Sequence, residues 1–322
     1  MWLEFLAILA GFALLVWSAD HFVNGAAALA NNLGVSTLVI GLTVVGFGTS
    51  APEILVALTA AVDGNAGLAI GNAVGSNIAN VGLILGLTAL VIPLSVSSQV
   101  LRREYPILLV VTITALLLVI DGELGFYDGL LLIFMLAGVL FLMWRVAVSG
   151  SARDPMLEDL EAEIPKTMST GKALLWLGSG LLLLVFASKI LVWGSVEVAS
   201  WLGVSDLVIG LTIVALGTSL PELATSMASA LKGEPDLALG NVIGSNLYNL
   251  LAVFSIPGLI APGVVDDVLL SRDMPAMMVL TFAIVGLAWT AKGVRHINRI
   301  GGLLLLIGYV SYQGWVIYSS LP

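Results

Sequence analysis

The sequence predicts an all-α membrane protein of about ten transmembrane helices, arranged as two five-helix repeats of inverted topology. Composition, a succession of long apolar stretches and an internal repeat carry this prediction. Of 322 residues, 59% are hydrophobic and only 10% are charged, which does not fit the surface of a soluble protein. The chain has no cysteine and a net charge of −9. Disulfides, thiolate metal sites and cysteine nucleophiles are therefore excluded, and nucleic acid is not an expected partner.

Ten charge-poor stretches are long enough to cross a bilayer, whose hydrocarbon core takes about 20 helical residues. A barrel would instead show short alternating segments, and open sheet edges are not tolerated in lipid. The first stretch lacks the basic start of a signal peptide, so we expect it to be a membrane helix. The predicted helices cover residues 4–28, 37–62, 66–92, 105–121, 126–147, 172–199, 206–231, 236–261, 273–291 and 299–319.

The basic residues predict the orientation, because Lys and Arg in short loops favour the cytoplasmic side. With an external N-terminus, ten of the twelve fall in inner connections, Arg272 falls outside and Lys189 lies within the sixth helix. We therefore expect a multi-pass protein of the cell (inner or plasma) membrane with both termini outside. Residues 149–171 then form a cytoplasmic acidic linker. It separates a first five-helix repeat, residues 1–148, from a second one, residues 172–322.

An internal repeat relates the two halves at an offset of 169 residues. Residues 33–43, LGVSTLVIGLT, match residues 202–212, LGVSDLVIGLT, at ten of eleven positions. Five helices per half is an odd number, so the two halves cross the membrane in opposite directions. Such inverted repeats are typical of transporters, whose site lies near the bilayer midplane between the repeats. The same offset aligns the motif GTSxPE, beginning at Gly48 and Gly217, and the motif GNxxGSNxxN, beginning at Gly71 and Gly240.

Glu53 and Glu222 lie about halfway along the second and seventh predicted helices. A carboxylate at the centre of a membrane helix costs about 2.5 to 3.5 kcal/mol on insertion scales and indicates a functional site. Pro52 and Pro221 precede the two acids. Because proline has no amide hydrogen, the carbonyls four residues earlier lose their helical donors. Backbone oxygens are thereby released beside both acids.

Further polar side chains recur every four residues around the acids, so they share helical faces. A threonine shares the face of each glutamate, and an Asn-Ser-Asn stripe follows the third and eighth helices. Asn77 and Asn246 lie off this stripe, and we interpret them as contacts between helices. The members of these faces are Thr49, Thr218, Asn72, Ser76, Asn80, Asn241, Ser245 and Asn249.

Carboxylates, hydroxyls, amide oxygens and carbonyls, without histidine or sulfur, are ligands for hard cations. Ca²⁺ takes six to eight such oxygens, whereas softer metals favour thiolate or imidazole. Two negative charges match one divalent ion, and a monovalent ion must compete in larger number for the same oxygens. This competition is a physical basis for exchange. A passive cation channel stays a second interpretation, while an enzyme is disfavoured because no nucleophile and base accompany the glutamates.

The paired GTSxPE and GNxxGSNxxN motifs resemble the repeats of the cation/calcium antiporter superfamily, specifically its prokaryotic sodium/calcium exchangers. The resemblance covers the whole transmembrane chain. It implies an antiporter that exchanges Na⁺ for Ca²⁺ by alternating access, with these ions as transported substrates and no resident cofactor. A proton- or potassium-coupled calcium exchanger is the alternative. The oligomeric state stays open.

The resemblance also implies which residues bind the ions. Glu53 and Glu222 are the expected principal ligands, and backbone oxygens at Gly46 and Ala215 are expected at an outer sodium site. Some relatives carry an aspartate at the position of Asn249, so here two acids supply the charge and the ion stoichiometry stays open. Contacts are further expected from Thr49, Ser50, Thr218, Ser219, Ser76, Asn80, Ser245 and Asn249.

Overall fold

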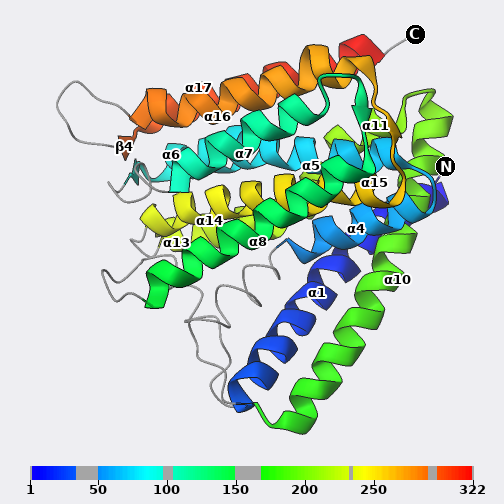
Figure 1. The fold of residues 1–322 in the computed structure, drawn as a ribbon, viewed down its shortest axis with the longest axis vertical. Coiled ribbons are helices and arrows are strands. Elements are labelled where there is room, and N and C mark those ends of the chain that lie inside the picture. Colours follow the sequence, from blue (N-terminus) through cyan, green and yellow to red (C-terminus); the bar gives the residue numbers. More distant parts are fainter. Residues whose placement is uncertain are drawn as a thin grey trace.

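The computed structural model describes residues 2–33, 50–96, 104–148, 168–231, 235–288 and 296–320. These residues are almost entirely helical, as Figure 1 shows. They contain eight helical stretches long and apolar enough to cross a membrane. Two shorter apolar helices, Ala51–Val62 and Tyr105–Leu118, occupy the second and fourth predicted positions. The all-helical prediction is confirmed.

The elements follow the predicted order, with η denoting a π-helical turn. In the first half they are α1 (Trp2–Asn32), α4 (Ala51–Val62), α5 (Ala66–Ala79), η2 (Asn80–Leu85), α6 (Gly86–Val91), α7 (Tyr105–Leu118) and α8 (Phe126–Val148). In the second half they are α10 (Thr170–Leu202), α11 (Asp206–Ile209), η4 (Gly210–Val214), α12 (Ala215–Thr218), α13 (Leu220–Leu231), α14 (Pro235–Tyr248), η5 (Asn249–Val253), α15 (Ser255–Ile260), η6 (Leu269–Asp273), α16 (Met274–Ala288) and α17 (Arg299–Ser320).

The third and eighth membrane helices form the centre of the protein. In the most apolar windows of 66–91 and 238–260, 78% and 83% of the residues are buried, against 28% and 33% in α1 and α10. Burial on all sides explains why these two helices tolerate so many small and polar residues: neighbouring helices, rather than lipid, surround them. The polar stripes of the GNxxGSNxxN motifs therefore lie inside the protein.

Helices α1 and α10 form an antiparallel pair that stands apart from the other helices along much of its length (Figure 1). Glycines at repeat-related positions allow this close packing. Gly11 lies against Leu191, and the equivalent Gly180 lies against Phe22. With 31 and 33 residues, each helix is about 45 to 50 Å long, more than the hydrocarbon core requires. The pair must therefore tilt or extend beyond that core.

One polar contact joins this pair to the centre of the protein. The hydroxyl of Thr59 on α4 lies 2.8 Å from that of Ser188 on α10, and both residues are buried. The Ser188 hydroxyl donates to the carbonyl of Val185 at 3.0 Å, so Thr59 is the donor to Ser188. A hydrogen bond thus crosses the interface between the helix pair and the centre.

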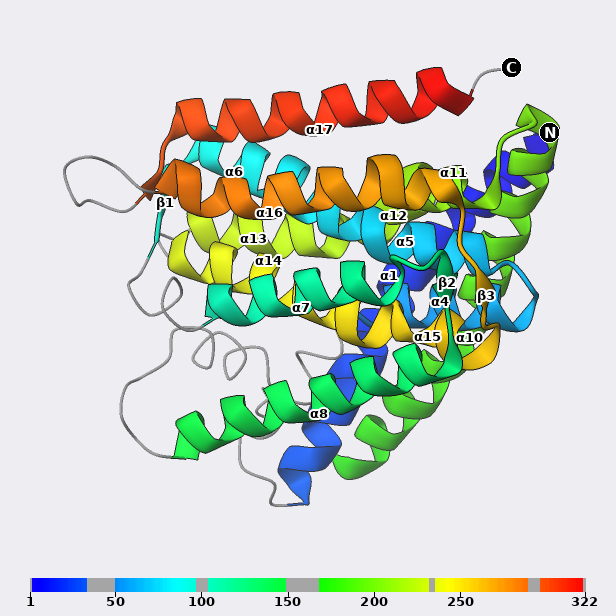
Figure 2. The ribbon, with the colours of Figure 1, turned by 45° about the horizontal axis from the view of Figure 1, so that its top comes forward.

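Two short antiparallel ladders make the inversion of the halves visible. Strand β1 (Leu94–Ser95) pairs with β4 (His296–Ile297), and β2 (Glu123–Leu124) pairs with β3 (Gly263–Val264). Strands β1 and β3 occupy repeat-equivalent positions, yet they lie at opposite ends of the molecule (Figure 2). The two chain termini lie at the same end. The predicted inverted five-helix repeats are confirmed.

The ninth membrane helix begins at Leu269, four residues before the predicted start, and includes Arg272 and Asp273. The prediction was wrong here because it began the helix at Asp273 and treated the charged Arg272 as part of a loop. Residues 149–167 of the predicted linker lie outside the described residues. The sides of the membrane assigned to the linker and to the termini stay predictions.

Candidate ion-binding site

Each predicted acid lies three residues after a serine whose backbone angles are not helical. Ser50 has φ −92° and ψ 7°, and the repeat-equivalent Ser219 has φ −87° and ψ 5°. Glu53 and Glu222 then fall in the first turn of α4 and α13, where the helix dipole favours a negative charge. Both are buried, with 0% and 1% of their surface exposed. The repeat therefore builds the same acidic helix start twice.

The two acids interact across the boundary between the halves. Their charges repel each other, and two adjacent buried carboxylates without a cation are costly because each has left water. Pro221 removes the amide donor that the carbonyl of Gly217 needs within the helix. The prediction for the equivalent carbonyl of Gly48 lies outside the described residues. This electrostatic arrangement favours a cation between the starts of α4 and α13.

The third and eighth membrane helices supply the other predicted ligands. Ser76, Asn80, Ser245 and Asn249 are all buried, the most exposed at 3%. The hydroxyl of Ser76 lies 3.4 Å from that of Thr218, so a stripe of the first half meets the acidic motif of the second half. The structure thus brings the two motifs together at the interface of the repeats.

Many oxygens in this region have no hydrogen-bond partner among the described residues. A buried polar atom without a partner is costly, so native proteins seldom keep such atoms unless a ligand uses them. Oxygen atoms are also the ligand type that hard cations prefer. The set consists of both carboxylate oxygens of Glu53 and of Glu222, the hydroxyls of Ser50, Ser219 and Ser245, and the amide oxygens of Asn80 and Asn249.

Asn72 connects the two acidic motifs. Its amide nitrogen donates to the backbone carbonyl of Glu53 at 3.2 Å, and its amide oxygen accepts from the Thr218 hydroxyl at 3.1 Å. The single Thr218 proton can go to Asn72 or to the carbonyl of Val214, also at 3.1 Å, and with either acceptor the hydroxyl oxygen keeps lone pairs for a cation. The repeat-equivalent Asn241 instead donates to Ser226 at 3.0 Å. Sequence reasoning placed both on the stripe but did not find this difference.

The asparagines predicted to face neighbouring helices do so. The amide nitrogen of Asn77 lies 3.6 Å from the sulfur of Met277, and the amide oxygen of Asn246 accepts from Asn80 at 3.0 Å. Both residues are 1% exposed. Asn246 is nevertheless more than a packing contact, because its partner Asn80 is itself a candidate ligand.

Of three further predicted ion contacts, the structure describes only Ala215. Thr49 and Gly46 lie outside the described residues, so their roles stay predictions. The carbonyl of Ala215 lies in the described helix α12 and accepts the amide of Ser219 at 3.2 Å. One of its lone pairs is therefore already engaged, and an ion at this carbonyl would use the second one.

Sequence reasoning missed two π-helical turns at the site. η2 begins at Asn80 and η5 begins at the equivalent Asn249. A π turn inserts one residue into a helix and is frequent at functional sites. Its recurrence at both asparagines indicates that the repeat uses it to set the direction of these side chains.

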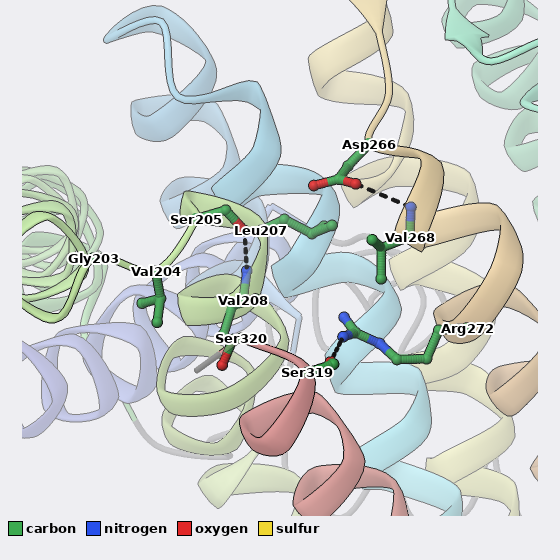
Figure 3. Close-up of a pocket in the computed structure, with 10 residues that line it drawn as sticks. All are labelled: Gly203, Val204, Ser205, Leu207, Val208, Asp266, Val268, Arg272, Ser319 and Ser320. Atoms are coloured by element: carbon green, nitrogen blue, oxygen red, sulfur yellow. Dashed lines mark hydrogen bonds between the residues drawn. The ribbon is translucent and has the colours of Figure 1, made fainter. Parts of the chain in front are cut away.

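Arg272 belongs to a buried network away from the acidic motifs. Its guanidinium group contacts both carboxylate oxygens of Asp273, at 2.6 and 3.2 Å, and donates to Ser319 at 2.6 Å. Tyr312 donates to the same carboxylate at 2.8 Å. Figure 3 shows Arg272 directed to Ser319 in a pocket of about 160 Å³ beside the α10–α11 connection. The one basic residue predicted outside is therefore neutralised within the protein.

The model of the family described as sodium/calcium exchanger protein matches residues 3–145 and 172–318, one segment in each half. The chain belongs to this family. The family consists of membrane transporters rather than enzymes.

Relatives of this exchanger match nearly its whole length. CaxA of Alkalimonas amylolytica is 46% identical, with 97% of this chain and 98% of CaxA covered. The inner membrane protein YrbG of Escherichia coli K12 is 39% identical, with 97% and 96% covered. The sodium/calcium exchanger MaX1 of Methanosarcina acetivorans is 32% identical, with 96% and 97% covered.

A solved structure of the sodium-calcium exchanger NCX_Mj, soaked with Na⁺ and Sr²⁺, is similar to the fold of this exchanger. The two share 33% sequence identity and a TM-score of 0.64, with 96% of this chain and 97% of NCX_Mj covered. The resemblance noted from the motifs is confirmed at the level of the family and of the fold.

Proposed function

We propose that this exchanger is a secondary active antiporter that exchanges Na⁺ for Ca²⁺ by alternating access at the repeat interface. The observation that carries the proposal is the pair of buried carboxylates, Glu53 and Glu222, each in the first turn of its helix. The family and the similarity to MaX1 and NCX_Mj support calcium as one of the exchanged cations.

The ligand set suits both ions. Ca²⁺ takes six to eight oxygens at about 2.3 to 2.6 Å, and the carboxylates, hydroxyls and amide oxygens around Glu53 and Glu222 are such ligands. The two negative charges balance one Ca²⁺ or two Na⁺. Because both ions use the same oxygens, binding of one excludes the other. A conformational change with the site empty is costly, because it leaves two buried charges without a cation. The protein therefore changes between its two access states only with a cation bound, and this couples the two fluxes.

The architecture supplies a means of alternating access. In inverted-repeat transporters, one bundle moves against the other around a fixed central site. Here the helix pair α1 and α10 packs chiefly on itself and stands apart from the buried central helices (Figure 1). We infer that the pair moves across the central helices and opens the site to each side in turn.

The identity of the counter-ion needs an experiment, because the names of CaxA and YrbG specify no ion. Uptake of radioactive Ca²⁺ is measured in proteoliposomes loaded with Na⁺ and diluted into Na⁺, K⁺ or choline buffers, with a pH gradient as a separate condition. We expect uptake only with an outward Na⁺ gradient. Uptake driven by protons or requiring K⁺ would move the exchanger to the alternative coupling, and uptake without any counter-ion would indicate a channel.

A further inference from the structure

Asn80 and Asn246 form a buried hydrogen bond between the two halves. The amide nitrogen of Asn80, at the start of η2, donates to the amide oxygen of Asn246 on α14 at 3.0 Å. Their exposed fractions are 0% and 1%. The amide oxygen of Asn80 has no partner among the described residues. A hydrogen bond therefore holds the NH₂ group of the Asn80 amide, and the amide oxygen is available as a ligand.

The direction of this bond matters for a cation. An amide group presents either an oxygen, which binds a cation, or an NH₂ group, which repels it. We propose that Asn246 is a positioning residue that fixes the Asn80 amide with its oxygen toward the transported ion. The proposal rests on the proposed function, since it requires that Asn80 contact the ion, but Asn246 itself belongs to no predicted ligand set. Preorganisation of this kind raises affinity because the ligand loses little freedom on binding.

The second half does not repeat the arrangement, which makes the effect specific to Asn246. The equivalents of Asn80 and Asn246 are Asn249 and Asn77. Neither amide atom of Asn249 has a partner among the described residues, and the nitrogen of Asn77 is directed to the sulfur of Met277. Leu108, at the position equivalent to Met277, offers no such acceptor. The two halves thus hold their amide ligands differently: a hydrogen bond holds the Asn80 amide, and none among the described residues holds the Asn249 amide.

Calcium binding by the purified exchanger, measured by isothermal titration calorimetry, tests the proposal without transport. Asn246→Leu removes the acceptor, and we expect a loss of Ca²⁺ affinity of about tenfold. Asn246→Asp keeps an acceptor oxygen at the same place, and affinity at least equal to that of the parent is expected. Asn77→Leu is the matched control at the repeat-equivalent position and is expected to bind as the parent does.

Two outcomes would overturn the positioning role. One is parental affinity in Asn246→Leu, or in Asn246→Ala where the larger side chain prevents folding. The other is an Asn246→Asp variant as weak as Asn246→Leu. Melting temperatures of all variants exclude a general loss of folding. Glu222→Gln separates this result from failure of the proposed function: full Ca²⁺ binding in that variant would overturn the proposed site and the role of Asn246 with it.

Discussion

The surroundings of Glu53 and Glu222 are formed both by residues next to them in the sequence and by residues of distant helices. The local part is the Ser-x-Pro-Glu segment, in which the sequence predicted the donor lost to proline but not the backbone angles of Ser50 and Ser219. The distant part is the asparagine network. The bond of Asn72 to the Glu53 carbonyl could not be predicted, because it depends on the rotation of one helix against another.

Glu53→Gln and Glu222→Gln test whether these two carboxylates bind the transported cations. Removing one charged partner of a buried ion costs about 3 to 5 kcal/mol, so each change should lower Ca²⁺ exchange by about two orders of magnitude or more. The volume is nearly unchanged, and a folded protein is expected by size-exclusion chromatography. Glu123→Gln, at an exposed acid of β2, is the control and should exchange at the parental rate. Parental rates in both site variants would show that the site is misassigned.

The hydrogen bond between the helices α10 and α4 has no equivalent in the other half. Thr59 and Ser188 correspond to Ala228 and Ala19 in the repeat, and alanine has no hydroxyl. If the two access states are related by the inverted repeat, the interface that replaces this one lacks the hydrogen bond. The Thr59–Ser188 bond therefore favours the conformation described here.

Ser188→Ala should shift the balance of the two states by about fivefold, since a buried hydrogen bond contributes about 1 kcal/mol. The chain has no native cysteine, so nitroxide labels can be placed at Phe186 on α10 and Leu303 on α17, both exposed. Distance distributions from pulsed electron paramagnetic resonance report the populations. Ala19→Ser combined with Ala228→Thr adds the equivalent hydrogen bond to the other state, so it should shift them in the same sense as Thr59→Val. Unchanged distributions in all variants would contradict the role of this bond.

The junction of η6 with α17 depends on the buried pair of Arg272 and Asp273. Removal of one partner leaves an uncompensated charge, so Arg272→Met should lower the free energy of unfolding by about 3 to 5 kcal/mol. Arg272→Met combined with Asp273→Leu should recover much of the loss. Thermal unfolding in detergent measures both, and a double variant less stable than Arg272→Met would contradict this interpretation.

For the whole molecule, the apolar stretches and the offset repeat were sufficient to predict about ten helices and the inversion of the halves, while the site between the repeats stays a prediction. They could not predict the π turns at Asn80 and Asn249 or the early start of the ninth helix. Both arise from tertiary packing: a π turn depends on how neighbouring helices hold the backbone, and charges enter a membrane helix only where a partner neutralises them.

The absence of native cysteine also makes the orientation testable. A single cysteine added after Ser320 or before Trp2 should react with a membrane-impermeant maleimide from outside intact cells. A cysteine at Ser151 in the linker should react only after the membrane is opened. Labelling of the linker from outside would reverse the predicted orientation, and opposite results at the two termini would contradict an even number of crossings.

Both ions are expected to use one oxygen site. Equilibrium binding of radioactive Ca²⁺ to the purified exchanger is measured at increasing Na⁺ concentration, with choline holding the ionic strength constant. We expect strict competition: the apparent Kd rises with more than the first power of Na⁺, the number of Ca²⁺ sites stays constant, and Glu222→Gln loses the Ca²⁺ binding. Ca²⁺ binding that Na⁺ leaves unchanged, or lowers only in capacity, would contradict a shared site between Glu53 and Glu222.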